Sequence, residues 1–224
     1  MRIFFIARKN KIIDENFNLL INNVIEKDRI IKIKNRNSKY NSLISKLLLQ
    51  YCFYNYYNYN IDHLSLKRTK YNKPFIEECD LYFNLSHSRD NIVLVFSEKP
   101  IGIDIESIDF FNYDIIKKFF SSKEKEYIYS FSNNKKKKLE YFKIWTQKES
   151  FVKCLGMGFF HSILNTNMVF NYMPIYKKSY KGTDYYFYTT YLNDKFIITL
   201  CSTYKIRDLH MIEVYLEELI DFFI

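Results

Sequence analysis

The clearest alternation of apolar and polar positions in this chain lies between Pro100 and Glu106, where three isoleucines alternate with Gly102, Asp104 and Glu106. A period of two predicts a β-strand whose successive side chains point to opposite faces. One face of this strand is therefore apolar, and the other carries both carboxylates, with a glycine before them. The rest of the chain is organised around this strand.

Two carboxylates on one strand face repel each other unless a cation or a basic group lies between them. Oxygen ligands held on a rigid strand suit a hard divalent ion such as Mg²⁺. An edge strand with a solvated acidic face explains the same spacing, and the strand taken alone favours that simpler interpretation.

Periods near 3.6 residues predict helices in the remaining sequence. The predicted helices cover residues 14–26, with Asp14 as the N-cap, then 38–56, 113–119, a segment from 122, 135–155 and part of 213–222. Gly156 follows the strongest of these patterns and predicts its C-cap. Extended segments are predicted at residues 2–7, 64–76, 81–86, 91–97, 166–172, 185–192 and 195–202, with a turn at 87–90.

The order strand, helices, strands occurs twice along the chain, and no flexible linker separates the two occurrences. We therefore predict an α+β fold with an N-terminal half at residues 1–100 and a C-terminal half at residues 101–224. No sequence identity between the halves is evident, so a repeat is inferred from the element order alone.

The composition indicates a globular protein with an anionic partner. Of the 224 residues, 48% are hydrophobic and 19% aromatic, which excludes a disordered chain. A net charge of +9 favours nucleic acid, a phosphorylated small molecule or an acidic protein as the partner. The four cysteines are scattered and fit reduced thiols. We find no signal-peptide pattern and no apolar run of transmembrane length, so we expect a cytoplasmic protein without a membrane partner.

The predicted helix at residues 135–155 carries a second set of chemical groups. Trp145, Glu149 and Lys153 recur every four residues and share one face, and Lys148 lies a modest rotation away. A solvated helix face with ion pairs has the same spacing, and the helix taken alone favours that interpretation. Trp145 fits a core position in either case.

A strand end in the first half carries a hydroxyl beside an imidazole. Ser86 and His87 stand where the predicted strand at residues 81–86 turns. Hydroxyl and ring N–H groups at such ends can donate hydrogen bonds to phosphate oxygens. A structural histidine is the simpler alternative for a single strand-end imidazole.

Taken together, the motifs are much more specific than each is alone. In order they are N-K-P at 72–74, F-N-L-S-H-S at 83–88, P-I-G-I-D-I-E at 100–106, F-F-S-S-K-E at 119–124, W-T-Q-K-E-S-F-V-K at 145–153 and G-M-G at 156–158. This order and spacing closely resemble the 4'-phosphopantetheinyl transferases, and specifically their larger, surfactin-type class.

The resemblance implies a fold and a metal site. Two similar α/β halves would form an intramolecular pseudo-dimer, with coenzyme A and the active site in the cleft between them. The family's metal ligands match Asp104, Glu106 and Glu149, which agrees with the need of the strand's two carboxylates for a cation. Mg²⁺ is the expected ion, with Mn²⁺ as an alternative.

The resemblance also implies contacts with coenzyme A, which is the substrate. Ser86 and His87 match the pair beside the nucleotide phosphates, with His87 near the 3'-phosphate. The other matched positions are Lys27, Arg29, Lys73, Lys148 and Lys153.

The chain departs from the family pattern at three positions near these contacts. Asn72 replaces the glycine before Lys73. Asn41 replaces an arginine that is frequent at the start of the long first-half helix, which would remove one nucleotide contact. Arg89 stands where glycine is frequent after S-H-S, and we expect it to compensate for Asn41.

The implied reaction is a substitution at phosphorus. A serine hydroxyl of a carrier protein attacks the β-phosphorus of coenzyme A and expels adenosine 3',5'-bisphosphate. Glu149 matches the family's base, acting directly or through water, and Lys153 would stabilise charge on the phosphate oxygens. Glu124 and Trp145 match positions that support the site.

The implied protein partner is an apo acyl or peptidyl carrier protein of fatty-acid, polyketide or nonribosomal peptide synthesis. Such carriers are acidic around the modified serine, so the net charge of +9 would steer their approach. Met157, Phe159 and Phe160 are candidates for an apolar docking surface, although core packing explains the two phenylalanines equally well. We expect a monomer that binds no nucleic acid.

Two other functional classes share parts of this pattern. A Mg²⁺-dependent nuclease or phosphodiesterase also combines acids with lysine, but its lysine usually lies close to the acidic pair in sequence, where this chain has Ile108. A nucleic-acid-binding module would use the basic and aromatic content, but the basic residues here are dispersed and form no known binding motif.

Overall fold

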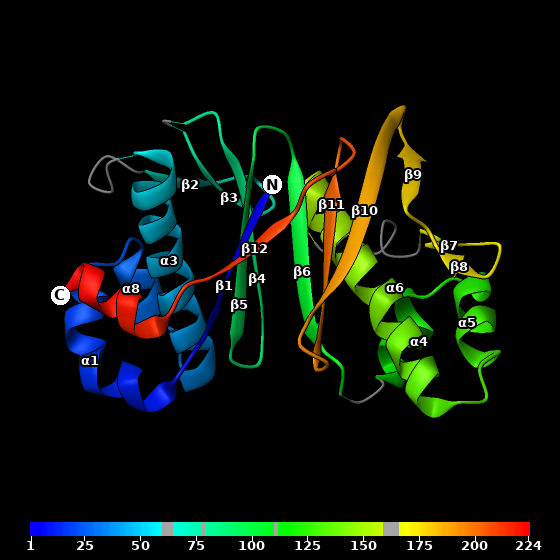
Figure 1. Ribbon diagram of the computed structural model, residues 1–224, viewed down its shortest axis with the longest axis horizontal. Coiled ribbons are helices and arrows are strands. Elements are labelled where there is room, and N and C mark those ends of the chain that lie inside the picture. The colour runs from blue at the N-terminus through cyan, green and yellow to red at the C-terminus, as the bar shows by residue number, and fades with distance from the viewer. Residues whose placement is uncertain (60–64, 78, 110–111, 159–165) are drawn as a thin grey trace.

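The computed structural model describes residues 1–59, 65–77, 79–109, 112–158 and 166–224. Two four-stranded sheets lie at the centre, with helices on the outer side of each (Figure 1). The helices beside the first sheet are α1 (Asn10–Asn22), α2 (Lys27–Ile31), α3 (Arg36–Tyr57) and α8 (Leu216–Phe223). The helices on the opposite side are α4 (Tyr113–Phe119), α5 (Ser122–Tyr129) and α6 (Asn134–Leu155). The fold is therefore mixed α and β, with the sheets between two helical layers.

The first sheet contains strands from both ends of the chain. Its order is β12 (His210–Glu213), β1 (Arg2–Ala7), β5 (Asn91–Ser97) and β4 (Tyr82–Ser88). β1 pairs in parallel with β12 and antiparallel with β5. Residues 210–223 thus pack with the first sheet although they follow the second in sequence. The division of the chain at residue 100 stays a prediction. The prediction did not include this return of the chain to the first sheet.

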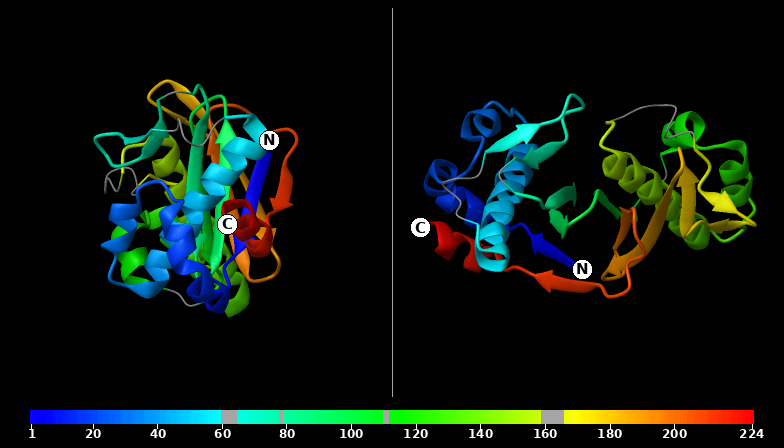
Figure 2. Two further views of the ribbon diagram at one scale, coloured as in Figure 1. Left: turned by 90° about the vertical axis from the view of Figure 1, so that its left-hand side faces the viewer. Right: turned by 90° about the horizontal axis from the view of Figure 1, so that it is seen from above.

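The second sheet is antiparallel throughout. Its order is β6 (Ile101–Ser107), β11 (Phe196–Ser202), β10 (Thr183–Leu192) and β9 (Lys177–Tyr180). Two short hairpins flank the sheets, formed by β2 (Leu66–Arg68) with β3 (Pro74–Ile76) and by β7 (Val169–Phe170) with β8 (Met173–Pro174). The view from above shows the two groups of helices on opposite sides of the sheets (Figure 2).

β6 is buried on both faces. Its three isoleucines pack with Val93 and Val95 of β5 in an apolar cluster between the two sheets. The opposite face lies against α6, and a Cβ atom added to Gly102 would be 2.0 Å from the carbonyl oxygen of Ser150. The alternation correctly predicted two different faces, but a helix rather than solvent covers the polar face.

β4 and β6 join the two sheets through side chains. Asn84, Ser86 and Ser88 point from β4 toward β6, and their side-chain oxygens accept hydrogen bonds from alternate backbone N–H groups of β6 at 2.8, 3.4 and 2.9 Å. These contacts supply partners that a neighbouring strand would otherwise provide. They also fix which residues of β4 face the carboxylates of β6.

Side-chain caps define several helix boundaries. Asn35, Asn112 and Asn133 cap α3, α4 and α6, and Ser121 forms a capping box with Glu124 at α5. Gly156 ends α6 in the left-handed conformation (φ +66°), which confirms its prediction as the C-cap.

Other predicted boundaries were wrong or incomplete. α1 begins at Asn10 rather than at Asp14, because the Asp14 carboxylate accepts from Arg36 and Tyr40 instead of capping the helix. The strand at 81–86 continues to Ser88, and the sequence did not predict β9 or β12. Among the described residues, no helix is both long and apolar enough to cross a membrane.

Candidate active site

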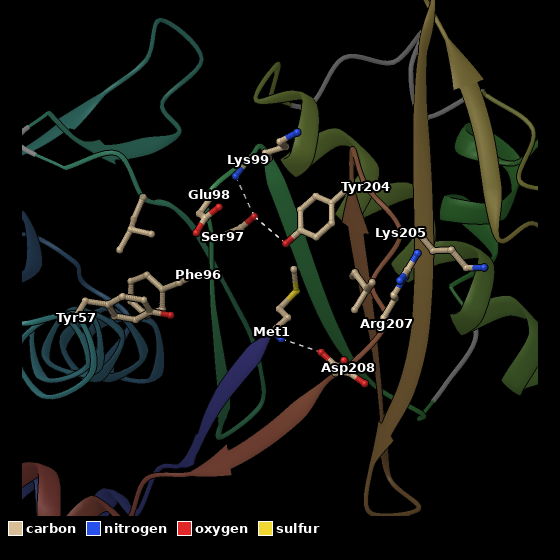
Figure 3. Close-up of a pocket in the computed structure, with 12 residues that line it drawn as sticks. Met1, Tyr57, Phe96, Ser97, Glu98, Lys99, Tyr204, Lys205, Arg207 and Asp208 are labelled. Atoms are coloured by element: carbon tan, nitrogen blue, oxygen red, sulfur yellow. Dashed lines mark hydrogen bonds between the residues drawn. The ribbon is translucent and has the colours of Figure 1, made fainter.

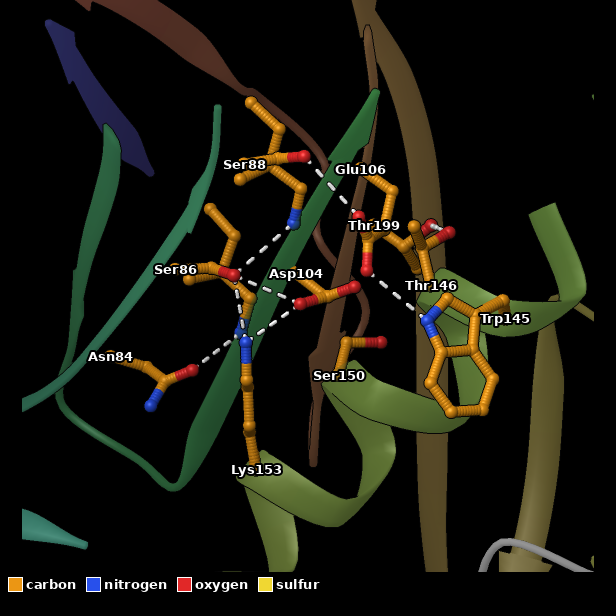
Figure 4. Close-up of polar contacts among 12 residues, drawn as sticks. Asn84, Ser86, Ser88, Asp104, Glu106, Trp145, Thr146, Ser150, Lys153 and Thr199 are labelled. Carbon is orange, nitrogen blue, oxygen red and sulfur yellow. Dashed lines mark hydrogen bonds and ion pairs between the residues drawn. The ribbon is translucent and has the colours of Figure 1, made fainter. Parts of the chain in front are cut away.

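Asp104, Lys153 and Ser86 form the central contact between β6, α6 and β4. Lys153 Nζ lies 2.7 Å from Asp104 Oδ1 and 2.8 Å from Ser86 Oγ, and the Ser86 hydroxyl donates to the same Asp104 oxygen at 2.9 Å (Figure 4). Asp104 is buried, whereas 26% of the Lys153 side chain is exposed. The ammonium group therefore stands at the boundary between a buried carboxylate and solvent.

Glu106 is held by residues of both neighbouring elements. Trp145 Nε1 of α6 donates to one carboxylate oxygen at 3.1 Å, and Ser88 Oγ of β4 donates to the other at 3.2 Å. Burial, followed by the charge of Asp104, raises the pKa of Glu106 to about 7 despite these two donors. Trp145 thus orients an acid as well as packing in the core.

Glu149 lies on the face of α6 that covers β6. Its side chain is buried, and its Oε1 atom has no hydrogen-bond partner among the described residues. Burial, followed by the negative charge of Asp104, raises the pKa of Glu149 to about 7. A carboxyl group of this kind exchanges protons readily near neutral pH.

The chemistry of these acids fits a divalent cation, although the three are not gathered into a ligand set. Asp104 Oδ2 and Glu149 Oε1 are both buried without a hydrogen-bond partner among the described residues. Such oxygens, together with two raised carboxyl pKa values, are typical of a site that needs positive charge. Among the described residues, however, no three His, Cys, Asp or Glu side chains are arranged to hold a metal ion. Lys153 supplies the positive charge instead.

Glu149 and Lys153 line a cavity of about 250 Å³ together with residues of the β2–β3 hairpin and Gly156. A neighbouring cavity of about 530 Å³ shares Lys73, Pro74 and Gly156 with it. The candidate site is therefore reachable from solvent along the carboxyl end of α6.

Lys73 anchors this end of the helix. Its Nζ donates to the backbone carbonyls of Lys153 at 2.6 Å and Ile101 at 3.1 Å, so it caps the last turn of α6 and ties it to the start of β6. Burial lowers its pKa. Lys73 borders the cavity, and its charged group contacts backbone oxygens.

Lys148 points away from Asp104, Glu106 and Glu149. Its side chain is 0% exposed and pairs with the equally buried Glu124 at 2.9 Å, and Nζ also donates to the Thr166 carbonyl at 2.8 Å. Glu124 additionally accepts from the backbone N–H groups of Ser121 and Met168. The pair thus ties α5 and the chain before β7 to α6, and it leaves Lys148 no exposed surface for a phosphate.

His87 and Ser86 point to opposite faces of β4. The exposed His87 ring lies beside Asn41 of α3, with Nδ1 3.4 Å from Asn41 Nδ2. The pKa of His87 is lowered, mainly because part of its ring is removed from water and next because of the positive charge of Lys153. Arg89 turns to Asp109, with Nε 2.6 Å from Oδ2, rather than toward Asn41.

The remaining predicted residues lie apart from the carboxylates. On α2, Lys27 donates to Asn22 at 2.6 Å, and Arg29 lies 3.8 Å from Glu26. Met157 follows α6, and Phe159 and Phe160 lie outside the described residues.

A cavity of about 590 Å³ lies elsewhere, between the end of β5 and residues 204–208. Figure 3 shows Tyr204 beside Ser97 there, with Lys99 and Arg207 at the margin. The hydroxyl oxygens of Tyr204 and Ser97 lie 3.2 Å apart. None of the predicted site residues lines it.

Sequence reasoning missed the roles of Asn84 and Ser88, which bond to β6, and the contact between Trp145 and Glu106. The signal for the first two was present, because N-L-S-H-S places Asn84, Ser86 and Ser88 on one strand face. The contact of Trp145 depends on how α6 lies on β6, which no local pattern specifies.

Models of one protein family match two consecutive stretches of the chain. Residues 13–99 match the model described as 4'-phosphopantetheinyl transferase, N-terminal, and residues 100–201 match that of the 4'-phosphopantetheinyl transferase superfamily. The chain is 31% identical over 163 residues to the 4'-phosphopantetheinyl transferase gsp of Aneurinibacillus migulanus, which covers 71% of this chain and 68% of that protein. The chain belongs to the 4'-phosphopantetheinyl transferase family.

Other transferases of the family are similar over shorter stretches. The 4'-phosphopantetheinyl transferase Sfp of Bacillus subtilis is 29% identical over 135 residues, which are 59% of this chain and 59% of that protein. The L-aminoadipate-semialdehyde dehydrogenase-phosphopantetheinyl transferase of Mus musculus is 31% identical over 147 residues, covering 59% of this chain and 48% of that protein. The chain thus matches less than two thirds of these two relatives. The likeness to gsp and Sfp confirms the surfactin-type class that the motifs predicted.

Proposed function

We propose that this protein transfers the 4'-phosphopantetheine group of coenzyme A to a serine of an apo carrier protein and releases adenosine 3',5'-bisphosphate. The observation that carries the proposal is the arrangement of Glu149 and Lys153 around buried Asp104, at the edge of an open cavity, in a chain of the transferase family. A base, a cation and room for a phosphate ester are what this substitution requires.

Glu149 acts as the base. In the transfer, the serine oxygen forms a bond to the β-phosphorus, the bond to the oxygen of the leaving nucleotide breaks, and the hydroxyl proton passes to Glu149. The position of Glu149 supports this role, because its buried carboxyl group lines the cavity together with Lys153.

Lys153 binds the pyrophosphate and stabilises the charge that develops there. Its contacts with Asp104 and Ser86 hold the ammonium group at the cavity in the absence of substrate. Such preorganised charge stabilises a transition state without reorganisation. Trp145 and Ser88 keep Glu106 oriented toward the same region.

Asp104, Glu106 and Glu149 are proposed to hold Mg²⁺, with Mn²⁺ as an alternative. The ion would supply Lewis-acid stabilisation of the phosphate oxygens. Two buried carboxylate oxygens without hydrogen-bond partners among the described residues support this assignment.

The nucleotide end of coenzyme A is proposed to lie toward His87, with the 3'-phosphate near its ring. Lys27 and Arg29 remain proposed contacts on the resemblance alone. We leave Lys148 out of the binding site because its charge is fully buried against Glu124, and we assign Lys73 the positioning of α6.

The two sheets with their helices are proposed to be the halves of a pseudo-dimer, with the site where β4 of one meets β6 of the other. The partner is proposed to be an acidic acyl or peptidyl carrier protein, drawn by the net charge of +9, and the protein is proposed to act as a monomer.

Release of adenosine 3',5'-bisphosphate, followed by liquid chromatography, tests the proposal. The protein is incubated with coenzyme A, Mg²⁺ and an apo-carrier, and separately without the carrier. We expect release only when the carrier is present. Equal release without it would favour the phosphodiesterase alternative, and no release with fatty-acid, polyketide and peptide carriers would contradict transfer.

A further inference from the structure

The turn between β4 and β5 is a two-residue turn, Arg89–Asp90, in an unfavourable conformation. Arg89 has φ +52°, in the left-handed region that residues with a Cβ atom rarely adopt, because the Cβ atom crowds the following carbonyl oxygen. Ser88 pairs with Asn91 directly across the turn, so the strain lies next to the strand that carries His87. Strained backbone of this kind persists where its surroundings hold it in place.

Contacts from three directions hold this turn. Asn41 Nδ2 of α3 donates to the Arg89 carbonyl at 3.2 Å. The Arg89 side chain reaches across to Asp109, two residues after β6, with Nη2 2.5 Å from Oδ2. The backbone N–H of Arg8, directly after β1, donates to the Asp90 carbonyl at 2.7 Å.

Arg8 adds an ion pair to this backbone contact. Its guanidinium group bonds to Asp90 Oδ1 and Asn10, and it lies 3.3 Å from Asn37 of α3. Only 1% of the Arg8 side chain is exposed, against 57% of the Asp90 side chain. Burying a guanidinium group is costly unless it is paired, so an arginine that only solubilised the surface would not be placed in this way.

The turn lies close to His87 in the hairpin. His87 pairs with Ile92 of β5, one pair beyond the Ser88–Asn91 pair that closes the turn, and its ring lies beside the same Asn41 that bonds to the Arg89 carbonyl. Asn37 and Asn41 stand one helical turn apart on α3, so Arg8 and His87 are tied to one face of that helix. A shift of the turn would therefore move the imidazole relative to α3.

We propose that Arg8 is a positioning residue for the nucleotide end of coenzyme A, because it fixes the β4–β5 turn through Asp90 and thereby orients His87. This inference rests on the proposed function and deepens it.

Asp90→Asn is the first test, because it removes the ion pair at an exposed carboxylate and keeps the backbone contact. We expect the KM for coenzyme A to rise 3- to 10-fold while kcat changes less than twofold. With 3'-dephospho-coenzyme A, the KM should change less than twofold. Arg8→Met should have a larger effect of the same kind. Arg8→Lys should be intermediate, because lysine keeps the charge but cannot reach Asp90 and Asn37 with one fork.

Glu217→Gln is the matched control, because it breaks the surface ion pair of the adjacent Lys9 and should leave both KM values unchanged. In a His87→Ala background, Asp90→Asn should raise the KM for coenzyme A less than twofold further. The proposal would be overturned if Asp90→Asn raised the KM for coenzyme A as much in the His87→Ala background as in the native protein. Equal KM increases for coenzyme A and 3'-dephospho-coenzyme A would also overturn it.

A binding measurement separates this inference from the proposed function. By calorimetry, Asp90→Asn should weaken the binding of adenosine 3',5'-bisphosphate 3- to 10-fold. It should weaken the binding of adenosine 5'-monophosphate less than twofold. This holds whether or not any carrier accepts phosphopantetheine. Equal weakening of both nucleotides would overturn the positioning role even in an active enzyme.

Discussion

Asp104 is the residue on which the electrostatics of the site depend. It binds Lys153 and Ser86, and its charge contributes to the raised pKa values of Glu106 and Glu149. Asp104→Asn keeps the shape but removes this charge, so both glutamate pKa values should fall. We expect the thermal midpoint in chelator-containing buffer to stay the same or rise. The transfer rate should fall at least ~100-fold, as expected for loss of preorganised charge.

The matched control for Asp104→Asn is Asp184→Asn, which breaks an exposed ion pair with Lys177 on the second sheet. It should change neither the rate nor the midpoint appreciably. If the activity of Asp104→Asn fell only in proportion to the folded fraction, Asp104 would be a packing residue.

Lys148 tests whether a lysine of the helix motif binds substrate or supports the fold. Lys148→Met leaves buried Glu124 without its cation, and removing one partner of a buried pair costs about 3–5 kcal/mol. We expect urea unfolding to show a loss of this size, with the KM for coenzyme A of the folded enzyme unchanged. Lys143→Met, which breaks a partly exposed pair with Glu140 on the same helix, should cost less than about 1 kcal/mol. A raised KM with normal stability would return Lys148 to the substrate site.

At the scale of elements, the contact between β6 and α6 brings the side chains of the candidate site together. β6 carries Asp104 and Glu106, α6 carries Glu149 and Lys153, and Gly102 permits their close approach. A Cβ at Gly102 would lie 2.0 Å from the Ser150 carbonyl oxygen and 2.4 Å from the Cys154 nitrogen, both backbone atoms. Neither atom can move without moving the helix.

Gly102→Ala should therefore destabilise the protein by at least about 3 kcal/mol, at or beyond the upper end of ordinary overpacking. Urea unfolding measures this loss. Gly182→Ala is the control, because Gly182 has φ +78° but open space around it, so only backbone strain of about 1 kcal/mol is expected. Similar costs at both positions would mean that α6 can shift away from β6 easily.

The sequence predicted these elements because their signals are local. The alternation around Asp104 and the four-residue spacing of Trp145, Glu149 and Lys153 depend only on neighbouring residues. The burial of Lys148 was not predictable in this way, because its partner lies on α5. The role of Arg8 was missed for the same reason, since Asp90 is more than eighty residues away in sequence.

At the scale of the whole molecule, the return of the chain to the first sheet could not be inferred from local patterns. β12 pairs with β1, and α8 buries Leu216, Leu219 and Ile220 in the core of the first sheet. Pairing between two chain ends has no short-range signal. The structure therefore differs from a simple succession of two independent halves.

A fragment of residues 1–100 lacks β12 and α8, and we expect it to remain largely unfolded by circular dichroism and by urea titration. A chain that joins residues 1–100 to 208–224 through a Gly/Ser linker should be measurably more helical and unfold cooperatively, because it restores the edge partner of β1. Cooperative folding of residues 1–100 alone would contradict this account of the first sheet.

The central claim is that this protein attaches phosphopantetheine to a carrier serine, and the intact mass of the carrier tests it most directly. Apo-carriers of the fatty-acid, polyketide and nonribosomal peptide types are incubated with the protein, coenzyme A and Mg²⁺, alongside carriers whose acceptor serine is replaced by alanine. The account predicts a mass gain of one phosphopantetheine on at least one native carrier and none on its alanine variant. No gain on any carrier, from folded protein that binds coenzyme A and with carriers that a related transferase does modify, would contradict it.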